Sequence, residues 1–150
     1  MDNQAVQPQP QAPTTSAPLI LIVEDDASLA KMYALKFSNE GFRVTVANDG
    51  ARGLQLAAEE RPNIILLDMM LPKYSGIEFL EQLQQHLKQI NMPILALSNL
   101  TEKQEADRAL KLGVKEYLAK AMNTPEDVVA KVKQYLGAPQ SPAKTEKTQL

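Results

Sequence analysis

The stretch Ile64-Ile65-Leu66-Leu67-Asp68-Met69-Met70-Leu71-Pro72-Lys73-Tyr74-Ser75-Gly76 decides how this chain folds. It opens with an apolar run, which is typical of a strand that is buried on both faces and has no use for a charge in its interior. Asp68 is therefore expected just past the strand end, where Pro72 and Gly76 indicate a loop. An acid in this position is either a turn residue or a functional group.

A second apolar run, 19–23, has the same layout and is followed directly by Glu24, Asp25 and Asp26. Ligands of open parallel sheets bind just outside the carboxyl ends of the strands. If the two strands are neighbours, at least three carboxylates converge there, and such a cluster repels itself unless protons or a cation neutralise it. Helix capping explains Asp26 well, because a helical pattern starts at Ala27, but it explains three acids in a row poorly.

Short apolar runs alternate with helical patterns along the rest of the chain. The candidate strands are 19–23, 43–47, 63–67, 93–97 and 114–118, and the candidate helices are 27–39, 50–60, 76–89, 102–112 and 125–136. Five repeats of a strand followed by a helix predict an α/β fold with a doubly wound parallel sheet, helices on both faces and right-handed crossovers.

The overall composition excludes several classes of function. The chain has 150 residues, 44% hydrophobic and 23% charged, which predicts one globular domain. A net charge of −2 gives no support for direct nucleic-acid binding, which usually needs a basic face. With no cysteine and one histidine, His86, a thiolate nucleophile, a Cys-ligated zinc and a His-based metal site or triad are disfavoured.

The two ends of the chain differ from the middle. Residues 1–18 are rich in Pro, Gln, Ala and Thr, and residues 137–150 combine Pro with alternating Lys, Thr and Glu. Neither stretch has the apolar content to order itself, so both are predicted to be disordered around a folded domain at 19–136. Neither a signal peptide nor a run of membrane-spanning length is recognisable, which predicts a cytoplasmic protein without membrane contact.

Two more polar residues are expected at the same edge of the sheet. Ser98 follows the fourth apolar run, and Lys120 follows the fifth. Each is unremarkable alone, but together they supply a hydroxyl and an ammonium that can hold phosphate oxygens. The acids favour Mg²⁺, a hard cation that proteins hold by one or two carboxylates with water and phosphate. Asp68 is then a candidate nucleophile toward a phosphoryl group, giving an aspartyl-phosphate.

These features resemble a known family. The runs LILIVEDDASL (19–29), IILLDMMLPKYSGIEFL (64–80) and GVKEYLAKA (113–121), with Ser98 between the last two, are similar to the receiver domain of bacterial two-component response regulators. The resemblance spans about residues 19–136. It implies a flavodoxin-like (CheY-like) fold whose five strands follow the order 2-1-3-4-5.

The resemblance also implies roles around the acids. Asp68 would be the phosphoacceptor, loaded by a histidine kinase or a phosphotransfer protein. Asp25 would ligate Mg²⁺ directly, Glu24 would act through water, and the backbone carbonyl of Met70 would complete the metal site.

The remaining implied roles concern the phosphoryl group and the switch. Ser98 and Lys120 would bind the phosphoryl oxygens. Phosphorylation would draw Ser98 toward the phosphate and reorient Tyr117, the aromatic switch position. An unidentified downstream protein would then bind the surface of the fourth helix, fifth strand and fifth helix, and a phosphorylation-linked dimer is also compatible with the family.

The chain departs from the family pattern at two positions, and two further side chains bear on the lifetime of the phosphorylated state. Family members usually have Pro after the lysine and a small residue after the Ser98 position, where this chain has Ala121 and Asn99. The residue two places after the acceptor often positions the attacking water, but here Met70 and Leu100 follow Asp68 and Ser98 by two. Neither side chain hydrogen-bonds a water usefully, so slow self-dephosphorylation is expected.

Three functions are weighed on this basis. The first is a stand-alone phosphorylation switch, which is not an enzyme in the usual sense because it catalyses only its own phosphoryl transfer and dephosphorylation. The second is an aspartate phosphohydrolase of the haloacid dehalogenase type, which needs a second Asp where this chain has Met70. The third is a receiver-like docking module that is never phosphorylated.

Overall fold

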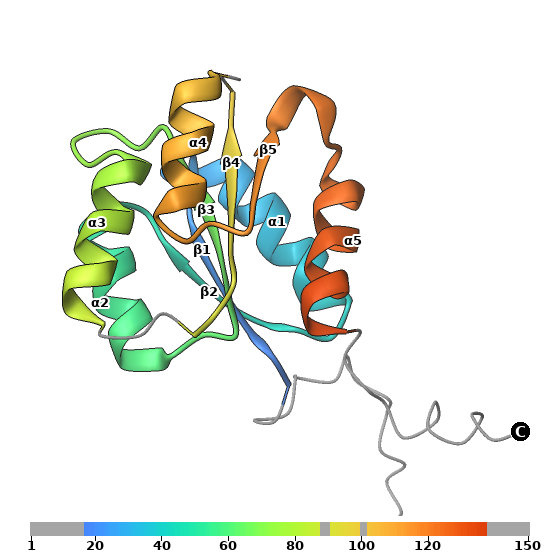
Figure 1. Ribbon diagram of the computed structural model, residues 1–150. Helices are drawn as coiled ribbons and strands as arrows, with labels where there is room; N and C mark the ends of the chain where they lie inside the picture. The colour runs from blue at the N-terminus through green and yellow to red at the C-terminus, as the bar shows by residue number, and fades with distance from the viewer. Residues whose placement is uncertain (1–16, 88–90, 100–101, 138–150) are drawn as a thin grey trace, which may run out of the picture.

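The computed structural model describes residues 17–87, 91–99 and 102–137. Five β-α units follow one another along the chain (Figure 1). The elements are β1 (Leu19–Val23), α1 (Ala27–Asn39), β2 (Arg43–Ala47), α2 (Gly50–Glu60), β3 (Ile64–Asp68), α3 (Gly76–His86), β4 (Ile94–Ser98), α4 (Lys103–Lys111), β5 (Glu116–Ala119), the 3-10 turn η1 (Lys120–Met122) and α5 (Pro125–Leu136).

The sheet has the predicted topology. Its five strands are parallel and lie in the order β2-β1-β3-β4-β5. Val23 at the end of β1 pairs with Leu67 of β3, so the acids that follow each strand are neighbours. Asp68 pairs in turn with Leu97 of β4, which places Ser98 one residue further along the same edge.

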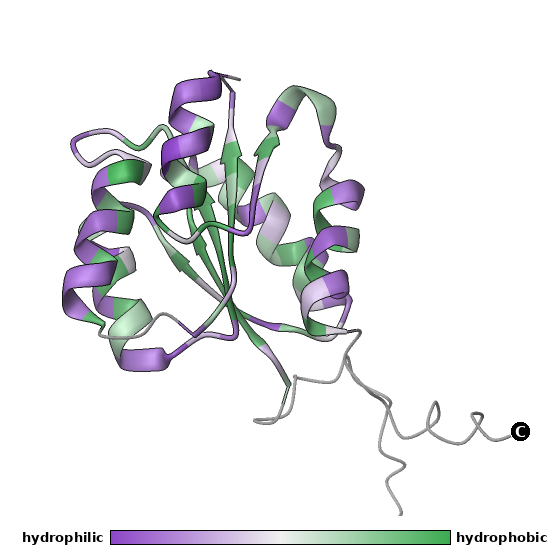
Figure 2. Ribbon diagram, in the orientation of Figure 1, coloured by the Kyte–Doolittle hydropathy of each residue, from purple (hydrophilic) through white to green (hydrophobic). Residues whose placement is uncertain are grey.

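Helices cover both faces of the sheet, as Figures 1 and 2 show, with apolar sides turned toward the strands. Successive residues of β1 and β3 alternate between two core clusters, because side chains of a strand point to opposite faces. One cluster joins the sheet to α2, α3 and α4, and the other joins it to α1 and α5. Two buried faces explain why the strands read as unbroken apolar runs.

Local sequence signals set the helix starts. Asp26 and Asp49 cap α1 and α2, accepting hydrogen bonds from the amides of Leu29 and Arg52. Capping boxes start α3 and α5, at Ser75 with Glu78 and at Thr124 with Asp127. These short polar side chains satisfy amides that the first helical turn leaves without intrahelical partners.

The predicted boundaries were wrong by a few residues in several places. β3 and β4 begin and end one residue later than predicted, so that Asp68 and Ser98 are the last strand residues and not the first loop residues. The reason is that the ladder continues: the Met69 amide donates to the Leu97 carbonyl at 2.9 Å. β5 runs from Glu116 to Ala119, two residues later at its start and one at its end than predicted, and the Val114 amide bonds the Ala109 carbonyl near the end of α4.

The helix ends and the chain ends complete the comparison. α4 is one residue shorter at each end than predicted, and α3 ends at His86, while residues 88 and 89 of its predicted span lie outside the described residues. Residues 1–16 and 138–150 also lie outside them, so their predicted disorder stays a prediction. Ala17 is held, since its carbonyl accepts a 2.8 Å hydrogen bond from Arg43 Nε. Among the described helices, none has the length and apolar character that a bilayer crossing requires.

Gly113, shortly after α4, has a backbone conformation that favours glycine, and a substitution there tests its contribution to stability. Its φ is +108°, and no heavy atom of the described residues lies within 4 Å of the place where a β-carbon would sit. Gly113→Ala should therefore lower the free energy of unfolding by about 1–3 kcal/mol through backbone strain alone, without a steric clash. Urea denaturation measures this loss. Gln104→Ala on exposed α4 is the matched control, and equal stability of the two variants would contradict the strain.

Candidate functional site

Three carboxylates gather at the carboxyl edge of the sheet. Glu24 directly follows β1 and is 3% exposed, Asp68 ends β3 and is 5% exposed, and Asp25 is exposed. The backbone holds Glu24 in place, because its amide donates to the Ala47 carbonyl of β2 at 3.0 Å. Each acid offers an oxygen, and these oxygens lie within 4.8 Å of one another. The structure thus brings together the acids that the sequence singled out.

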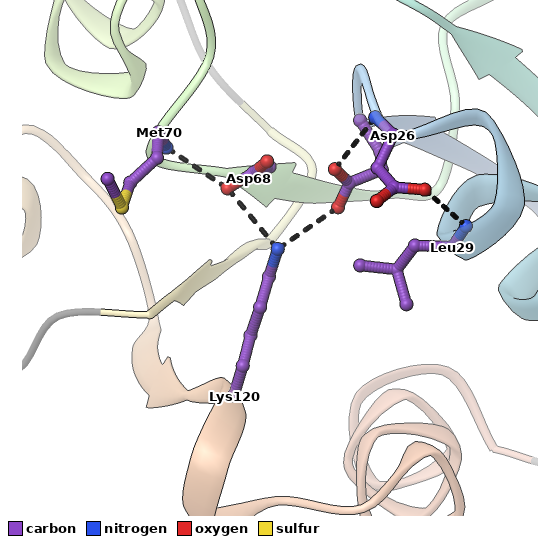
Figure 3. Close-up of polar contacts among 6 residues, drawn as sticks. Asp26, Leu29, Asp68, Met70 and Lys120 are labelled. Atoms are coloured by element: carbon purple, nitrogen blue, oxygen red, sulfur yellow. Dashed lines mark hydrogen bonds and ion pairs between the residues drawn. The ribbon is translucent and has the colours of Figure 1, made fainter.

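Lys120 reaches into this cluster from η1 (Figure 3). Its Nζ lies 3.3 Å from Glu24 Oε1 and 3.6 Å from Asp68 Oδ1, and its side chain is largely buried. The presence of Ala121 after Lys120 does not prevent this contact. Among the residues that the structure describes, Lys120 is the ammonium paired with these acids, so three carboxylates face one positive charge.

The electrostatics of the cluster favour a cation. Burial, together with the adjacent Asp68 carboxylate, raises the pKa of Glu24 to about 7, although the Asp26 amide and Lys120 act in the opposite direction. The charged form of Glu24 is therefore costly unless further positive charge is supplied. The donors are all carboxylate oxygens, and Asp25 is open to solvent, which fits a hard divalent cation such as Mg²⁺ that keeps several waters.

Met70 lies beside the acids on the loop that follows β3. Its amide donates a 3.0 Å hydrogen bond to Asp68 Oδ1, and its side chain is 46% exposed (Figure 3). The backbone of Met70 is thus next to the cluster. Metal ligation by its carbonyl remains a prediction.

Asp26 behaves as the capping interpretation expects. Its carboxylate accepts a 3.0 Å hydrogen bond from the Leu29 amide at the start of α1 and is not part of the carboxylate cluster. Its own amide donates to Glu24 Oε2 at 3.2 Å. Asp26 therefore starts the helix and orients Glu24 through its backbone.

Ser98 and Tyr117 lie on the adjacent strands β4 and β5, beyond β3 in the sheet. Ser98 is fully buried at the end of β4, and the neighbouring residue of β5 is Ala119. The Tyr117 hydroxyl donates a short hydrogen bond to Glu105 of α4. Burial and Glu105 raise the pKa of Tyr117 to about 12, while the Ser98 hydroxyl acts in the opposite direction. These residues connect the edge of the sheet to α4.

Glu105 was not identified from the sequence. The contact joins a helix to a strand twelve residues later, and a helical acid on an amphipathic pattern looks like any solvated residue. Asn99 is exposed next to Ser98, and Leu100 lies outside the described residues.

The geometry of the site has a counterpart in known proteins. The response regulator receiver domain family matches residues 20–133. The chain belongs to this family. Among curated relatives, the alkaline phosphatase synthesis transcriptional regulatory protein PhoP of Bacillus subtilis is 37% identical over 117 residues, which cover 78% of this chain and 48% of PhoP. The chain thus spans about half the length of the curated relatives it matches.

Solved receiver domains have the same fold. The receiver domain of the Francisella response regulator 1452 is 30% identical with a TM-score of 0.71, and the alignment covers 79% of this chain and 95% of that one. The BeF3-activated receiver domain of Klebsiella pneumoniae RstA is 28% identical with a TM-score of 0.70, covering 79% and 97% of the two chains. These likenesses confirm the fold and family that the sequence indicated.

The metal site can be tested with two adjacent acids. Asp25→Ala should weaken Mg²⁺ binding by roughly tenfold or more, since even residues that only orient a ligand contribute on that scale. Asp26→Ala should instead lower the free energy of unfolding by about 1 kcal/mol, by loss of the cap, with Mg²⁺ affinity unchanged. Calorimetric titration and urea denaturation measure the two effects. Equal Mg²⁺ affinity of wild type and Asp25→Ala would discard the site.

Proposed function

We propose that this receiver domain accepts a phosphoryl group on Asp68 from a phosphohistidine of a kinase or phosphotransfer protein. The observation that carries the proposal is the cluster of Glu24, Asp25 and Asp68 around Lys120 at the carboxyl edge of the sheet. A relative in the same family is described as BeF3-activated, and beryllofluoride has the shape of a phosphoryl group. A function as a signalling domain follows, not as an enzyme that turns over a separate substrate.

In the proposed transfer the nitrogen-phosphorus bond of the donor breaks and a bond from an Asp68 oxygen to phosphorus forms. Phosphoryl transfer is catalysed mainly by positioning and by charge stabilisation. The Met70 amide orients the acceptor carboxylate through its bond to Oδ1, and the Lys120 ammonium offsets charge on the phosphoryl oxygens. Ser98 would hold another of these oxygens.

The residues Glu24 and Asp25, with Asp68 and the Met70 carbonyl, would hold Mg²⁺. When bound, the cation would supply positive charge that offsets the negative charge of the phosphoryl group. Asp25 is exposed and Glu24 buried, which is compatible with the roles that the resemblance implies, in which Asp25 would ligate the cation directly and Glu24 would act through water. Glu24 also holds Lys120 in place by their 3.3 Å ion pair.

The output would pass through Ser98 and Tyr117 to the surface formed by α4, β5 and α5. Tyr117 is bonded to Glu105 of α4, so its rearrangement on phosphorylation would break or remake a contact of that helix. A ligand shifts such an equilibrium by its different affinity for the two states. We propose a downstream protein as the partner of this surface, in a cytoplasmic setting, without direct nucleic-acid contact by this domain.

Covalent labelling tests the acceptor. Incubation with acetyl phosphate and Mg²⁺ should add one phosphoryl group, about 80 Da, through an aspartyl-phosphate, and intact-mass spectrometry detects it. Asp68→Asn should remain unmodified, because the amide oxygen is a poor nucleophile. Asp107→Asn on α4 is the matched control and should be labelled like wild type.

The outcome of the labelling experiment distinguishes the phosphorylation switch from the alternative functions. Label that persists in Asp68→Asn would move the acceptor elsewhere. A wild type that folds, binds Mg²⁺ and yet takes no label would favour the docking module. The phosphohydrolase is already disfavoured by the family match and by Met70 in place of its second Asp.

The lifetime of the phosphorylated state should depend on Met70. The Met70 amide faces Asp68 while its exposed side chain points away from the carboxylate (Figure 3), and a thioether is a poor hydrogen-bond partner for an attacking water. Met70→Asn should therefore speed dephosphorylation several-fold, measured as decay of the labelled mass at equal Mg²⁺. The control Leu110→Asn replaces an equally exposed apolar residue on α4 and should leave the decay unchanged. A wild type that decays as fast as Met70→Asn would show that Met70 does not set the lifetime.

A further inference from the structure

We propose that Tyr74 is a positioning residue, whose ring clamps the loop between β3 and α3 onto the start of α2 and so holds the two halves of the acid site together. Neither the family resemblance nor the site geometry assigned a role to Tyr74 or to its contact, Gly50. The inference rests on the proposed function, because it concerns the same acid site.

The contact between Tyr74 and Gly50 is unusually close. A β-carbon built on Gly50 would overlap the Tyr74 ring, lying 2.8 Å from Cε2 and 2.9 Å from Cγ. Real side chains do not come so near, so any residue larger than glycine at position 50 must displace the ring. Gly50 is buried and Tyr74 half-buried, and burial raises the pKa of the Tyr74 phenol. The ring therefore packs against the backbone of α2.

On one side, the clamp ends on the loop that carries Met70. This loop is closed at its base, since the Gly76 amide donates to the Met69 carbonyl at 3.1 Å. A β-carbon on Gly76 would lie 2.7 Å from Met69 Cα, so the two ends of the loop touch. Lys73, next to Tyr74, has a φ of +67°, a backbone conformation that residues other than glycine adopt only at a cost in free energy. A strained residue persists only where its surroundings hold it, and the Tyr74 ring is the adjacent anchor.

On the other side, the clamp ends on the segment that holds Glu24. Gly50 directly follows Asp49, the cap of α2, and β2 ends at Ala47 shortly before it. The Ala47 carbonyl accepts the Glu24 amide at 3.0 Å. The Met70 amide orients Asp68 on one segment, and the Ala47 carbonyl supports Glu24 on the other. Tyr74 thus joins these two segments. No direct hydrogen bond between these two segments is needed for their spacing to be maintained.

Ordinary packing makes a different prediction from positioning. If Tyr74 only adds buried area, its loss lowers stability but leaves the folded protein with a normal acid site. If Tyr74 positions the loop, its loss weakens Mg²⁺ binding and loosens the Met70 amide even where folding is complete. Hydrogen exchange of that amide is a readout that needs no metal, because the amide bonds a side chain of the protein itself, Asp68 Oδ1.

The experiment compares four variants of this contact and one control variant by Mg²⁺ titration, by acetyl-phosphate labelling rate and by amide exchange in protein without added Mg²⁺. Tyr74→Ala removes the ring, and Tyr74→Phe keeps the ring while removing the hydroxyl. Gly50→Ala pushes the ring away, and the double variant Gly50→Ala with Tyr74→Ala tests whether the two changes act through one contact. Val132→Ala, in the core under α5 on the opposite face of the sheet, controls for lost stability.

Tyr74→Ala and Gly50→Ala should each weaken Mg²⁺ binding by roughly tenfold, the lower end of the effect of residues that hold metal ligands in place. Both should label more slowly and exchange the Met70 amide faster. Tyr74→Phe should match wild type. The double variant should match Tyr74→Ala, since a methyl group has no ring left to displace, and Val132→Ala should bind Mg²⁺ normally despite a lower melting temperature.

The clamp is overturned if folded Tyr74→Ala keeps wild-type Mg²⁺ affinity and Met70 exchange, or if Tyr74→Phe loses as much as Tyr74→Ala. A wild type that neither binds Mg²⁺ nor takes label would overturn the proposed function instead. In that case the exchange of the Met70 amide still decides whether the ring holds the loop.

Discussion

The rest of the structure depends on the pairing of two buried carboxylates, Glu24 and Asp68, with the ammonium of Lys120. Charges removed from water are costly unless paired, and one ammonium does not balance this cluster. The parallel strand order places the ends of β1 and β3 side by side, which brings the two carboxylates together. Lys120, which follows β5, forms ion pairs with both of them. The residual negative charge at this edge suits a cation, which is the basis of the proposed Mg²⁺-dependent phosphorylation of Asp68.

The same edge also connects to a distant surface. Ser98 is buried one residue beyond the level of Asp68, and Tyr117 on the next strand reaches α4 through Glu105. A polar path through an otherwise apolar sheet is expensive to build, and each of its groups needs a partner. Such a path can have two arrangements of similar energy, which is what a switch requires and what an ordinary packed core lacks.

In the proposed function the loop between β3 and α3 has the opposite requirement, because it must stay in place while the phosphoryl group enters. The close approach of Gly76 to Met69, the left-handed Lys73 and the Tyr74 ring on Gly50 all restrict it. Position 50 needs a glycine because the Tyr74 ring occupies the place where the β-carbon of any other residue would lie. The proposed function thus needs a restrained loop beside Asp68 together with a contact between β5 and α4 that can rearrange.

The sequence by itself determined the fold class, the strand order by resemblance and the identity of the acids, because unbroken apolar runs that end in polar residues are local signals. It also predicted the caps at Asp26 and Thr124, since a cap bonds amides of its own helix. Only the tertiary structure decided the strand ends at Asp68 and Ser98, which depend on hydrogen bonds to neighbouring strands. It alone revealed the contacts of Tyr117 with Glu105 and of Tyr74 with Gly50, because each joins segments whose distance apart is set by packing and not by the spacing of residues along the chain.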